Sequence, residues 1–233
     1  MKLKFNKKKF FISLVAILGA GALTWYGLTK YKRPDSYQIA LDNLAEARFY
    51  LKTASNEIAS IQFYSGMREE TYKMDGVATT TKPYAVVSIE PTNEVLASKT
   101  EIAGTITINA VPEEIILIKN PYGTNFAIDL EKLIEDTSDI QLSLKIDPET
   151  TIDYELTNAM PEGSITWEKA LETATKELEK KIIDTQKLEA YIKVLCDKAS
   201  ADSPFWYVTF ATTSGETFFV VIDPNGNIIG KTE

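Results

Sequence analysis

Hydrophobic residues change their spacing along this chain, and the spacing predicts where helices and strands lie. From residue 36 to residue 64 they recur at steps of three and four, which is the period of an amphipathic helix. We therefore expect one long helix there, ended by Gly66. The stripe is close to a heptad seam, so this helix could pack on a sheet or mediate homo-oligomerisation. Its apolar residues are Tyr37, Leu41, Leu44, Ala47, Leu51, Ala54, Ile58 and Ile61.

The next hundred residues carry short runs of β-branched and aromatic residues separated by turn residues. This pattern is typical of strands in an antiparallel sheet. Loops are marked by Lys82-Pro83, Asn120-Pro121-Tyr122-Gly123 and Pro161-Glu162-Gly163. A short helix is expected at residues 129–135, and strands are expected at residues 84–90, 101–109, 114–119, 140–146 and 151–156.

A second helical pattern starts after the Pro161-Glu162-Gly163 loop, with Thr166 as the expected N-cap. Its apolar stripe continues through Leu188 and Leu195 to Ala199, with a bend at residues 184–186, and Asp202-Ser203-Pro204 ends it. Cys196 is the only cysteine of the chain, which excludes an internal disulfide. Because Cys196 falls in the stripe, we interpret it as a buried apolar side chain and not as a reactive thiol.

The last thirty residues give the clearest local pattern. Residues 206–211 alternate as a strand, Ser214-Gly215-Glu216 forms a turn, and residues 218–222 return as a second strand. Asp223-Pro224-Asn225-Gly226 matches a type I turn, with Asp first, Pro second and Gly fourth. A third short strand is expected at residues 227–230.

The N-terminal segment predicts membrane insertion. Residues 10–29 carry no charge, and as a helix they would span roughly 30 Å, the thickness of the hydrocarbon core of a bilayer. Five lysines precede the run, and Lys30, Lys32 and Arg33 follow it, which favours a cytoplasmic N-terminus and an extracellular C-terminal part. The alternative is a signal peptide cleaved after Ala22. The five lysines are Lys2, Lys4, Lys7, Lys8 and Lys9.

Charge separates this segment from the rest of the chain. All 33 acidic residues follow Arg33, together with 17 of the 25 basic residues, so the remainder has a net charge of about −16. Such a surface repels nucleic acid and anionic lipid, which leaves proteins, neutral glycans and cations as partners. The lysine-rich start and the absence of histidine suit a low-GC Gram-positive bacterium.

No pattern in the chain predicts catalysis or a cofactor. The absence of histidine excludes Ser/His triads, Cys/His pairs and imidazole metal sites. The segment Gly226 to Thr232 has three residues between its glycines where a phosphate loop needs four. The turn Asp223 to Asn227 offers oxygen donors but lacks the terminal acid of an EF-hand. We therefore predict a non-enzymatic protein with no catalytic residues, no cofactor and no metal site.

Residues 164–230 resemble the PepSY family. The resemblance is carried by the helix start Ile165-Thr166-Trp167-Glu168-Lys169-Ala170-Leu171, by the strand Trp206-Tyr207-Val208-Thr209-Phe210, and by the strand-turn-strand from Val220 to Gly230. It implies an extracytoplasmic, cystatin-like helix-on-sheet module that binds or inhibits protein partners. A weaker echo of the same pattern at residues 36–96 would make two modules, as in membrane-anchored regulators of cell-wall elongation.

Together these observations predict an α+β protein: an N-terminal transmembrane helix followed by one or two helix-on-antiparallel-sheet modules of cystatin/PepSY type. The expected parts are a cytoplasmic basic tail at residues 1–9, an anchor at 10–29, an extracytoplasmic α+β domain at 36–160 and a PepSY-like domain at 164–233. The expected function is to bind and regulate a surface protein, through protease inhibition or control of cell-wall assembly. The alternative is a structural subunit of an envelope secretion or conjugation machine. Candidate protein contacts are Trp206, Tyr207 and Phe218.

Overall fold

The computed structural model describes residues 35–232 except for residues 72, 186, 198 and 199. The described residues from Ser36 onward belong to one compact unit. Its four described helices are α2 (Ser36–Asp42), α3 (Glu94–Ala97), α4 (Trp167–Glu177) and α5 (Glu179–Thr185). Its strands are β1 (Leu44–Ser55), β2 (Ala59–Glu69), β3 (Thr81–Pro91), β4 (Glu101–Ile108), β5 (Val111–Lys119), β6 (Phe126–Leu130), β7 (Ile140–Lys145), β8 (Thr151–Glu155), β9 (Thr157–Asn158), β10 (Leu188–Asp197), β11 (Ser200–Thr212), β12 (Thr217–Ile222) and β13 (Ile228–Lys231).

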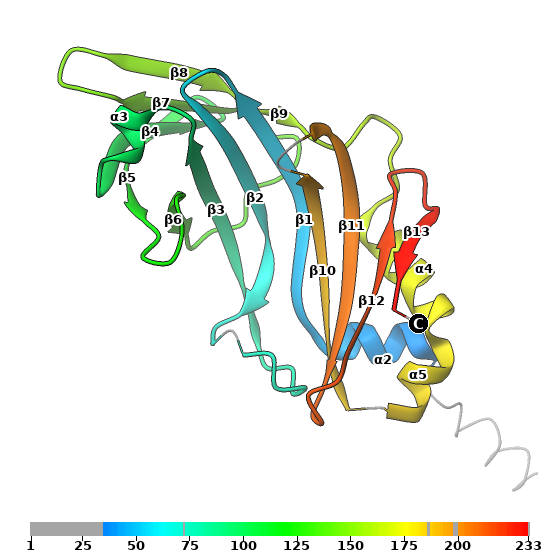
Figure 1. Cartoon of the computed structure of the whole chain (residues 1–233). Coiled ribbons are helices and arrows are strands. Elements are labelled where there is room, and N and C mark those ends of the chain that lie inside the picture. The colour runs from blue at the N-terminus through cyan, green and yellow to red at the C-terminus, as the bar shows by residue number, and fades with distance from the viewer. Residues whose placement is uncertain (1–34, 72, 186, 198–199, 233) are drawn as a thin grey trace, which may run out of the picture. The chain divides into compact units, whose positions relative to one another are not determined.

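These strands join into a single 13-stranded sheet, shown in Figure 1. Its order is β13-β12-β11-β10-β1-β2-β3-β6-β5-β4-β7-β8, and β9 pairs with β1 off this path. The β1–β10 pair is parallel, and the other pairs are antiparallel. The predicted fold class, with separate cystatin-like helix-on-sheet modules behind a membrane helix, is therefore wrong, because one mixed sheet runs from residue 44 to residue 231.

Residues 36–64 do not form the expected long helix. The helix α2 ends at Asp42, and the chain then enters β1 and β2. The strand β1 lies in the middle of the sheet and buries residues on both faces, so its apolar residues do not alternate strictly. A β-bulge between Arg48 and Tyr50 adds one residue to the repeat. Bulge and two-sided burial together give the steps of three and four that mimic a helix.

The strand β10 replaces the second half of the other predicted helix. Ala190, Ile192 and Val194 face the core beneath the helices, whereas Glu189 and Tyr191 lie at the alternate positions. The Leu, Glu, Ala and Lys residues here favour a helix locally, but pairing with β1 and β11 on both sides overrides that preference. Cys196 accordingly lies on a strand, half-buried, where its Sγ accepts a hydrogen bond of 3.5 Å from Nε2 of Gln62.

Local predictions near the C-terminus are confirmed. Thr166 caps α4, since its hydroxyl accepts a hydrogen bond from the backbone N–H of Lys169. The strands β11, β12 and β13 follow the expected order, and Asp223 anchors the turn by accepting hydrogen bonds from the backbone of Asn225 and Asn227. The five strands expected between residues 84 and 156 are β3, β4, β5, β7 and β8. The prediction of a short helix at residues 129–135 is wrong, because β6 extends to Leu130.

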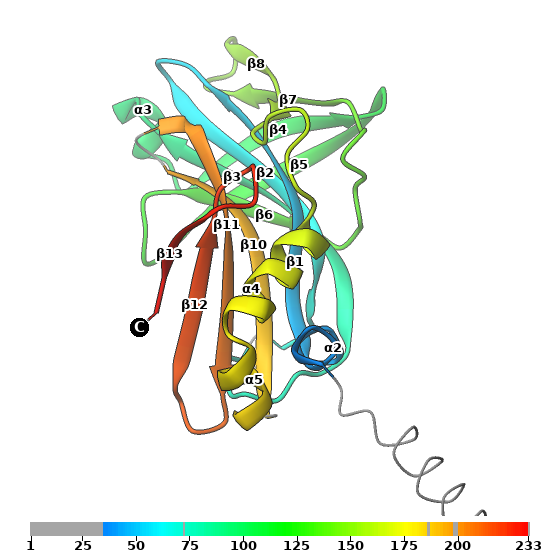
Figure 2. The ribbon, with the colours of Figure 1, turned by 90° about the vertical axis from the view of Figure 1, so that its right-hand side faces the viewer.

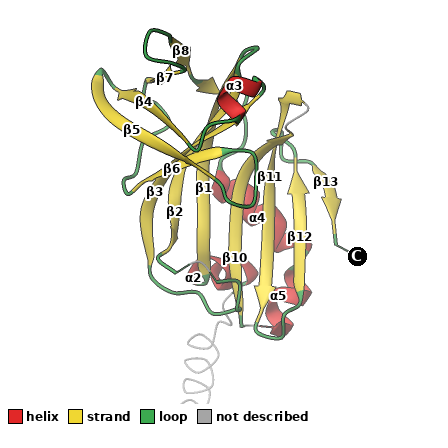
Figure 3. Ribbon diagram, turned by 60° about the vertical axis from the view of Figure 1, so that its left-hand side comes forward, coloured by secondary structure: helices red, strands yellow, loops and turns green. Residues whose placement is uncertain are grey.

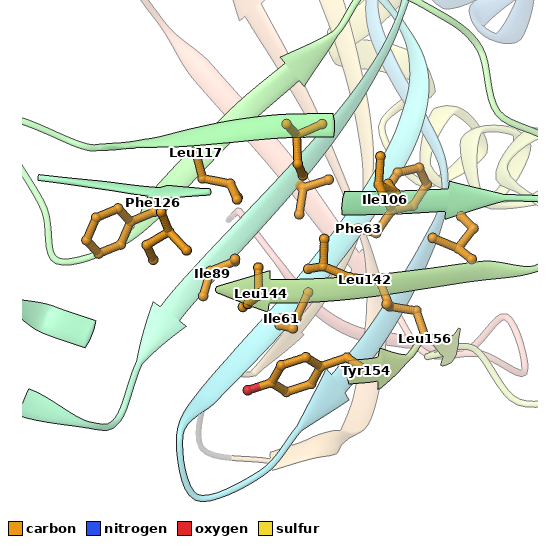
Figure 4. Close-up of a cluster of buried hydrophobic side chains, with 14 of the residues drawn as sticks. Ile61, Phe63, Ile89, Ile106, Leu117, Phe126, Leu142, Leu144, Tyr154 and Leu156 are labelled. Atoms are coloured by element: carbon orange, nitrogen blue, oxygen red, sulfur yellow. The ribbon is translucent and has the colours of Figure 1, made fainter. Parts of the chain in front are cut away.

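Two large hydrophobic cores lie on this sheet, in addition to a small cluster of Ala45, Tyr191 and Ala211. In one, α2, α4 and α5 cover β10, β11 and β12, as Figure 2 shows from the helix side and Figure 3 from another angle. In the other, the β4, β5, β7 and β8 end of the sheet packs back onto β2 and β3 (Figure 4). Side chains such as Ile61, Phe63, Ile89, Leu142 and Leu144 fill this second core and are almost completely buried.

Among the described residues, none of the helices has the length and apolar character needed to cross a bilayer. The span expected at residues 10–29 lies outside the described residues. The same holds for the basic tail at residues 1–9.

Candidate functional site

The candidate site lies where β1 changes its neighbour. Residues 44–48 of β1 pair with β10, whereas Lys52 and Thr53 pair with β9. Between these two pairings lies Phe49, the residue added by the β-bulge. Bulges locally disrupt pairing and redirect side chains. A pocket of about 780 Å³ opens at this point.

Segments from four parts of the chain line the pocket. They are the bulged part of β1, the loop before β7, the segment from Asn158 through the start of α4, and Trp206 on β11. Tyr50 and Ile134 belong to one hydrophobic core, and Leu51 and Trp206 belong to the other, so the pocket lies between the two cores. The lining residues are Phe49, Tyr50, Leu51, Leu133, Ile134, Glu135, Asp136, Asn158, Met160, Pro161, Glu162, Gly163, Ser164, Ile165, Thr166, Trp167, Glu168 and Trp206.

Aromatic side chains form one apolar wall. The rings of Phe49 and Trp167 lie 5.4 Å apart at a tilt of 32°. Trp167 is the first residue of α4, so the Thr166 cap that starts the helix also places this ring. The segment before the cap is held by a 2.9 Å hydrogen bond from the backbone N–H of Ile165 to the carbonyl of Pro224. The wall is thus fixed to both the sheet and the C-terminal turn.

One polar group of a lining residue is buried without a partner. Nε1 of Trp206 makes no hydrogen bond to the described residues, although Trp206 is only 2% exposed, whereas the Tyr50 hydroxyl has the Ser65 side chain as a hydrogen-bond partner. Burying such a group unsatisfied costs about 1–3 kcal/mol. An indole N–H can only donate, so Trp206 lacks an acceptor.

Acidic side chains surround the pocket opening. Glu135, Asp136, Glu162 and Glu168 are exposed lining residues, and no Lys or Arg is among the described residues that line it. Lys52 is not among the lining residues, but its Nζ donates a 2.6 Å hydrogen bond to Oδ1 of the lining residue Asn158. Burial lowers the pKa of Lys52, and the charges of Asp136 and Asp139 oppose this effect.

The pKa values of two buried tyrosines, Tyr50 and Tyr84, indicate how the stability of the domain changes at alkaline pH. Burial is the main reason that the pKa values of Tyr50 and Tyr84 are raised, and nearby acids add to it. The folded state therefore disfavours their ionised forms, so their contribution to stability is complete below the ordinary tyrosine pKa of about 10 and is lost as pH rises above it. The lowered pKa of Lys52 changes the stability in the opposite direction as pH rises, but Lys52 is a single group.

We accordingly expect the free energy of unfolding to fall above about pH 10. Urea denaturation across that range, with tyrosinate absorbance recorded in parallel, measures it. The replacement Tyr84→Phe should flatten the alkaline slope while lowering stability at neutral pH. An unchanged slope in that variant would contradict the assignment to Tyr84.

The three predicted contact residues do not lie together. Trp206 and Phe218 are 2% and 1% exposed, and both pack in the core beneath the helices. The ring of Phe218 stacks on Phe210 at 5.3 Å. Tyr207 lies on the opposite face of the sheet, half-buried, with its ring 5.4 Å from that of Phe219. Of the three, only Trp206 lines the pocket.

The other pocket residues were missed at the level of sequence. Phe49 and Tyr50 fell within the expected long helix, and Trp167 was assigned only to a helix start. The acids Glu135 and Glu162 come close to each other only through pairing between strands that are distant in the sequence. No local pattern of residues predicts this proximity. The adjacent aromatic residues Phe49 and Tyr50 were the one available signal, because two consecutive large aromatics suit a strand buried on both faces.

The described residues contain no group of three acidic or cysteine side chains placed to hold a metal ion. Both carboxylate oxygens of Asp223 accept hydrogen bonds within their own turn, which also lowers the pKa of this carboxyl group. The pocket offers binding chemistry: apolar walls, the unpartnered indole N–H of Trp206 and an acidic rim. No protein-family model, curated protein or solved structure matches this chain.

Proposed function

We propose that residues 36–233 form a non-enzymatic domain that binds and regulates another protein outside the cytoplasm, and that the N-terminal segment directs it to the cell membrane. The pocket between the two cores carries this proposal. Binding pockets for small groups typically measure about 300–1,000 Å³ and combine apolar walls with a few polar groups. The pocket, at about 780 Å³, has that size and composition.

Sequence features support the location and the kind of partner. The basic and apolar N-terminal segment is typical of a chain inserted in or exported across a membrane. The acidic remainder is repelled by nucleic acid and anionic lipid, which favours a protein partner. The resemblance of residues 164–230 to the PepSY family favours a regulatory role, either restraint of a protease or control of cell-wall assembly.

The alternative function, a structural subunit assembled through residues 36–64, loses its basis. Those residues form α2 and the strands β1 and β2, so the helical seam expected to drive homo-oligomerisation does not exist. No other observation favours that function.

Site-specific crosslinking in cells tests the proposal. A photoreactive amino acid replaces Leu133, which lines the pocket and is 46% exposed, in the full-length chain. We expect one surface protein to be captured from this position and identified by mass spectrometry. A matched probe at Tyr122, which is 98% exposed and lies outside the pocket lining, should not capture it. Equal capture from both positions, or capture of this chain alone, would contradict the proposal.

A further inference from the structure

The charges around the pocket define one property of its occupant. Four exposed carboxylates belong to the lining and no basic side chain of the described residues does. Single exposed charges attract weakly, but a cleft lined by one sign of charge concentrates the opposite sign. A group that enters here should therefore be cationic.

The interior defines a second property. Phe49, Leu51, Met160, Ile165 and Trp167 give apolar walls that favour an apolar body. A small inorganic cation would leave these walls in contact with water. The occupant should therefore carry apolar groups next to its positive charge.

The unpartnered indole N–H of Trp206 defines a third property. This buried group can only donate, so it needs an acceptor from the occupant. A simple amine or guanidine offers donors only, so it would leave the indole unsatisfied. A peptide backbone supplies carbonyl acceptors and amide donors together with its side chains.

We propose that the pocket binds a segment of the partner protein in which a lysine or arginine is flanked by apolar residues. This inference rests on the proposed function and names the chemistry that the same pocket recognises. The basic side chain meets the rim acids, the apolar residues pack on the Phe49 and Trp167 rings, and a backbone carbonyl accepts a hydrogen bond from the indole N–H of Trp206.

Fluorescence anisotropy with the purified full-length chain tests this proposal. The probe is a fluorescein-labelled peptide, Gly-Leu-Lys-Leu-Lys-Leu-Gly. We expect saturable binding that weakens as salt is added. Two control peptides separate the contributions: one has glutamate in place of both lysines, and the other has serine in place of the leucines. Neither should bind at the concentrations that saturate the parent peptide, and binding of either one equal to the parent would overturn the proposal.

Variants of the rim locate the binding. Replacing two rim acids together, Asp136→Asn with Glu162→Gln, should weaken binding about three- to tenfold. The matched variant, Glu149→Gln with Glu216→Gln, removes the same charge from exposed positions outside the pocket and should change nothing. Equal weakening in both double variants would overturn the proposal, because it would show that the peptide is attracted only by the overall negative charge of the protein.

The crosslinking and the peptide-binding experiments test different claims. Capture of a protein through Leu133 without binding of the basic peptide would keep the proposed function and reject the ligand class. Binding of the peptide without a captured protein would keep the ligand class and reject the proposed function.

Discussion

Replacing Gly66 by alanine is expected to destabilise the domain by about 3 kcal/mol or more. Gly66 lies in β2 opposite Arg48, directly beside the β-bulge of β1. A Cβ at this position would lie 1.9 Å from the carbonyl oxygen of Ala47. Because that oxygen belongs to backbone in the middle of the sheet, it cannot move aside without disturbing the β1–β2 pairing. Urea denaturation of the variant measures the effect.

A second glycine supplies the control. At Gly230 in β13, an added Cβ would have its nearest contact at 3.5 Å, an ordinary distance to the side chain of Val221. The change Gly230→Ala should therefore leave the denaturation midpoint nearly unchanged. If both variants unfold at the midpoint of the unaltered protein, β1 and β2 do not approach each other at the bulge as closely as described.

Replacing Glu46 by alanine is the second change with a large expected effect, a loss of about 3–5 kcal/mol. The Glu46 side chain is buried, at 4% exposure. It accepts hydrogen bonds of 2.6 Å from the Tyr84 hydroxyl and 2.7 Å from Nζ of Lys193, and it lies 3.7 Å from Arg48. Removing the carboxylate leaves the charges of Lys193 and Arg48 in a poorly solvated part of the sheet, which costs more than the lost hydrogen bonds.

Denaturation midpoints of two variants separate burial from charge. Glu172 forms a 2.8 Å ion pair with Lys169 on the surface of α4, where both side chains are more than half exposed. Exposed pairs of this kind contribute little, so Glu172→Ala should barely change the midpoint. A similar loss in both variants would mean that Glu46 acts only through net charge and that the buried cluster does not stabilise the fold.

The cluster around Glu46 also shows why β1 could not be assigned from its own residues. Glu46 and Arg48 are charged residues in a central strand, which binary patterning places at a surface. Their burial becomes favourable only because β3 supplies Tyr84 and β10 supplies Lys193. The ring of Tyr64 on β2 also lies 3.6 Å from the guanidinium of Arg48.

The sequence by itself determined the features whose signals are complete within a few residues. The Thr166 cap, the β11–β12 hairpin and the Asp223 turn depend on local hydrogen bonds and backbone preferences, and all three were predicted correctly. The absence of histidine and the acidic charge beyond Arg33 also follow from composition alone.

Only the tertiary structure decided the central strands and the pocket. The strands β1 and β10 have mixed helical and strand preferences, and they pair in parallel although they lie far apart in the chain. Hydrogen bonds and packing from neighbouring strands override those preferences, and no local window contains the neighbours. The pocket depends on the same pairing, because Phe49, Glu135 and Trp167 meet only where β1 leaves β10 and joins β9.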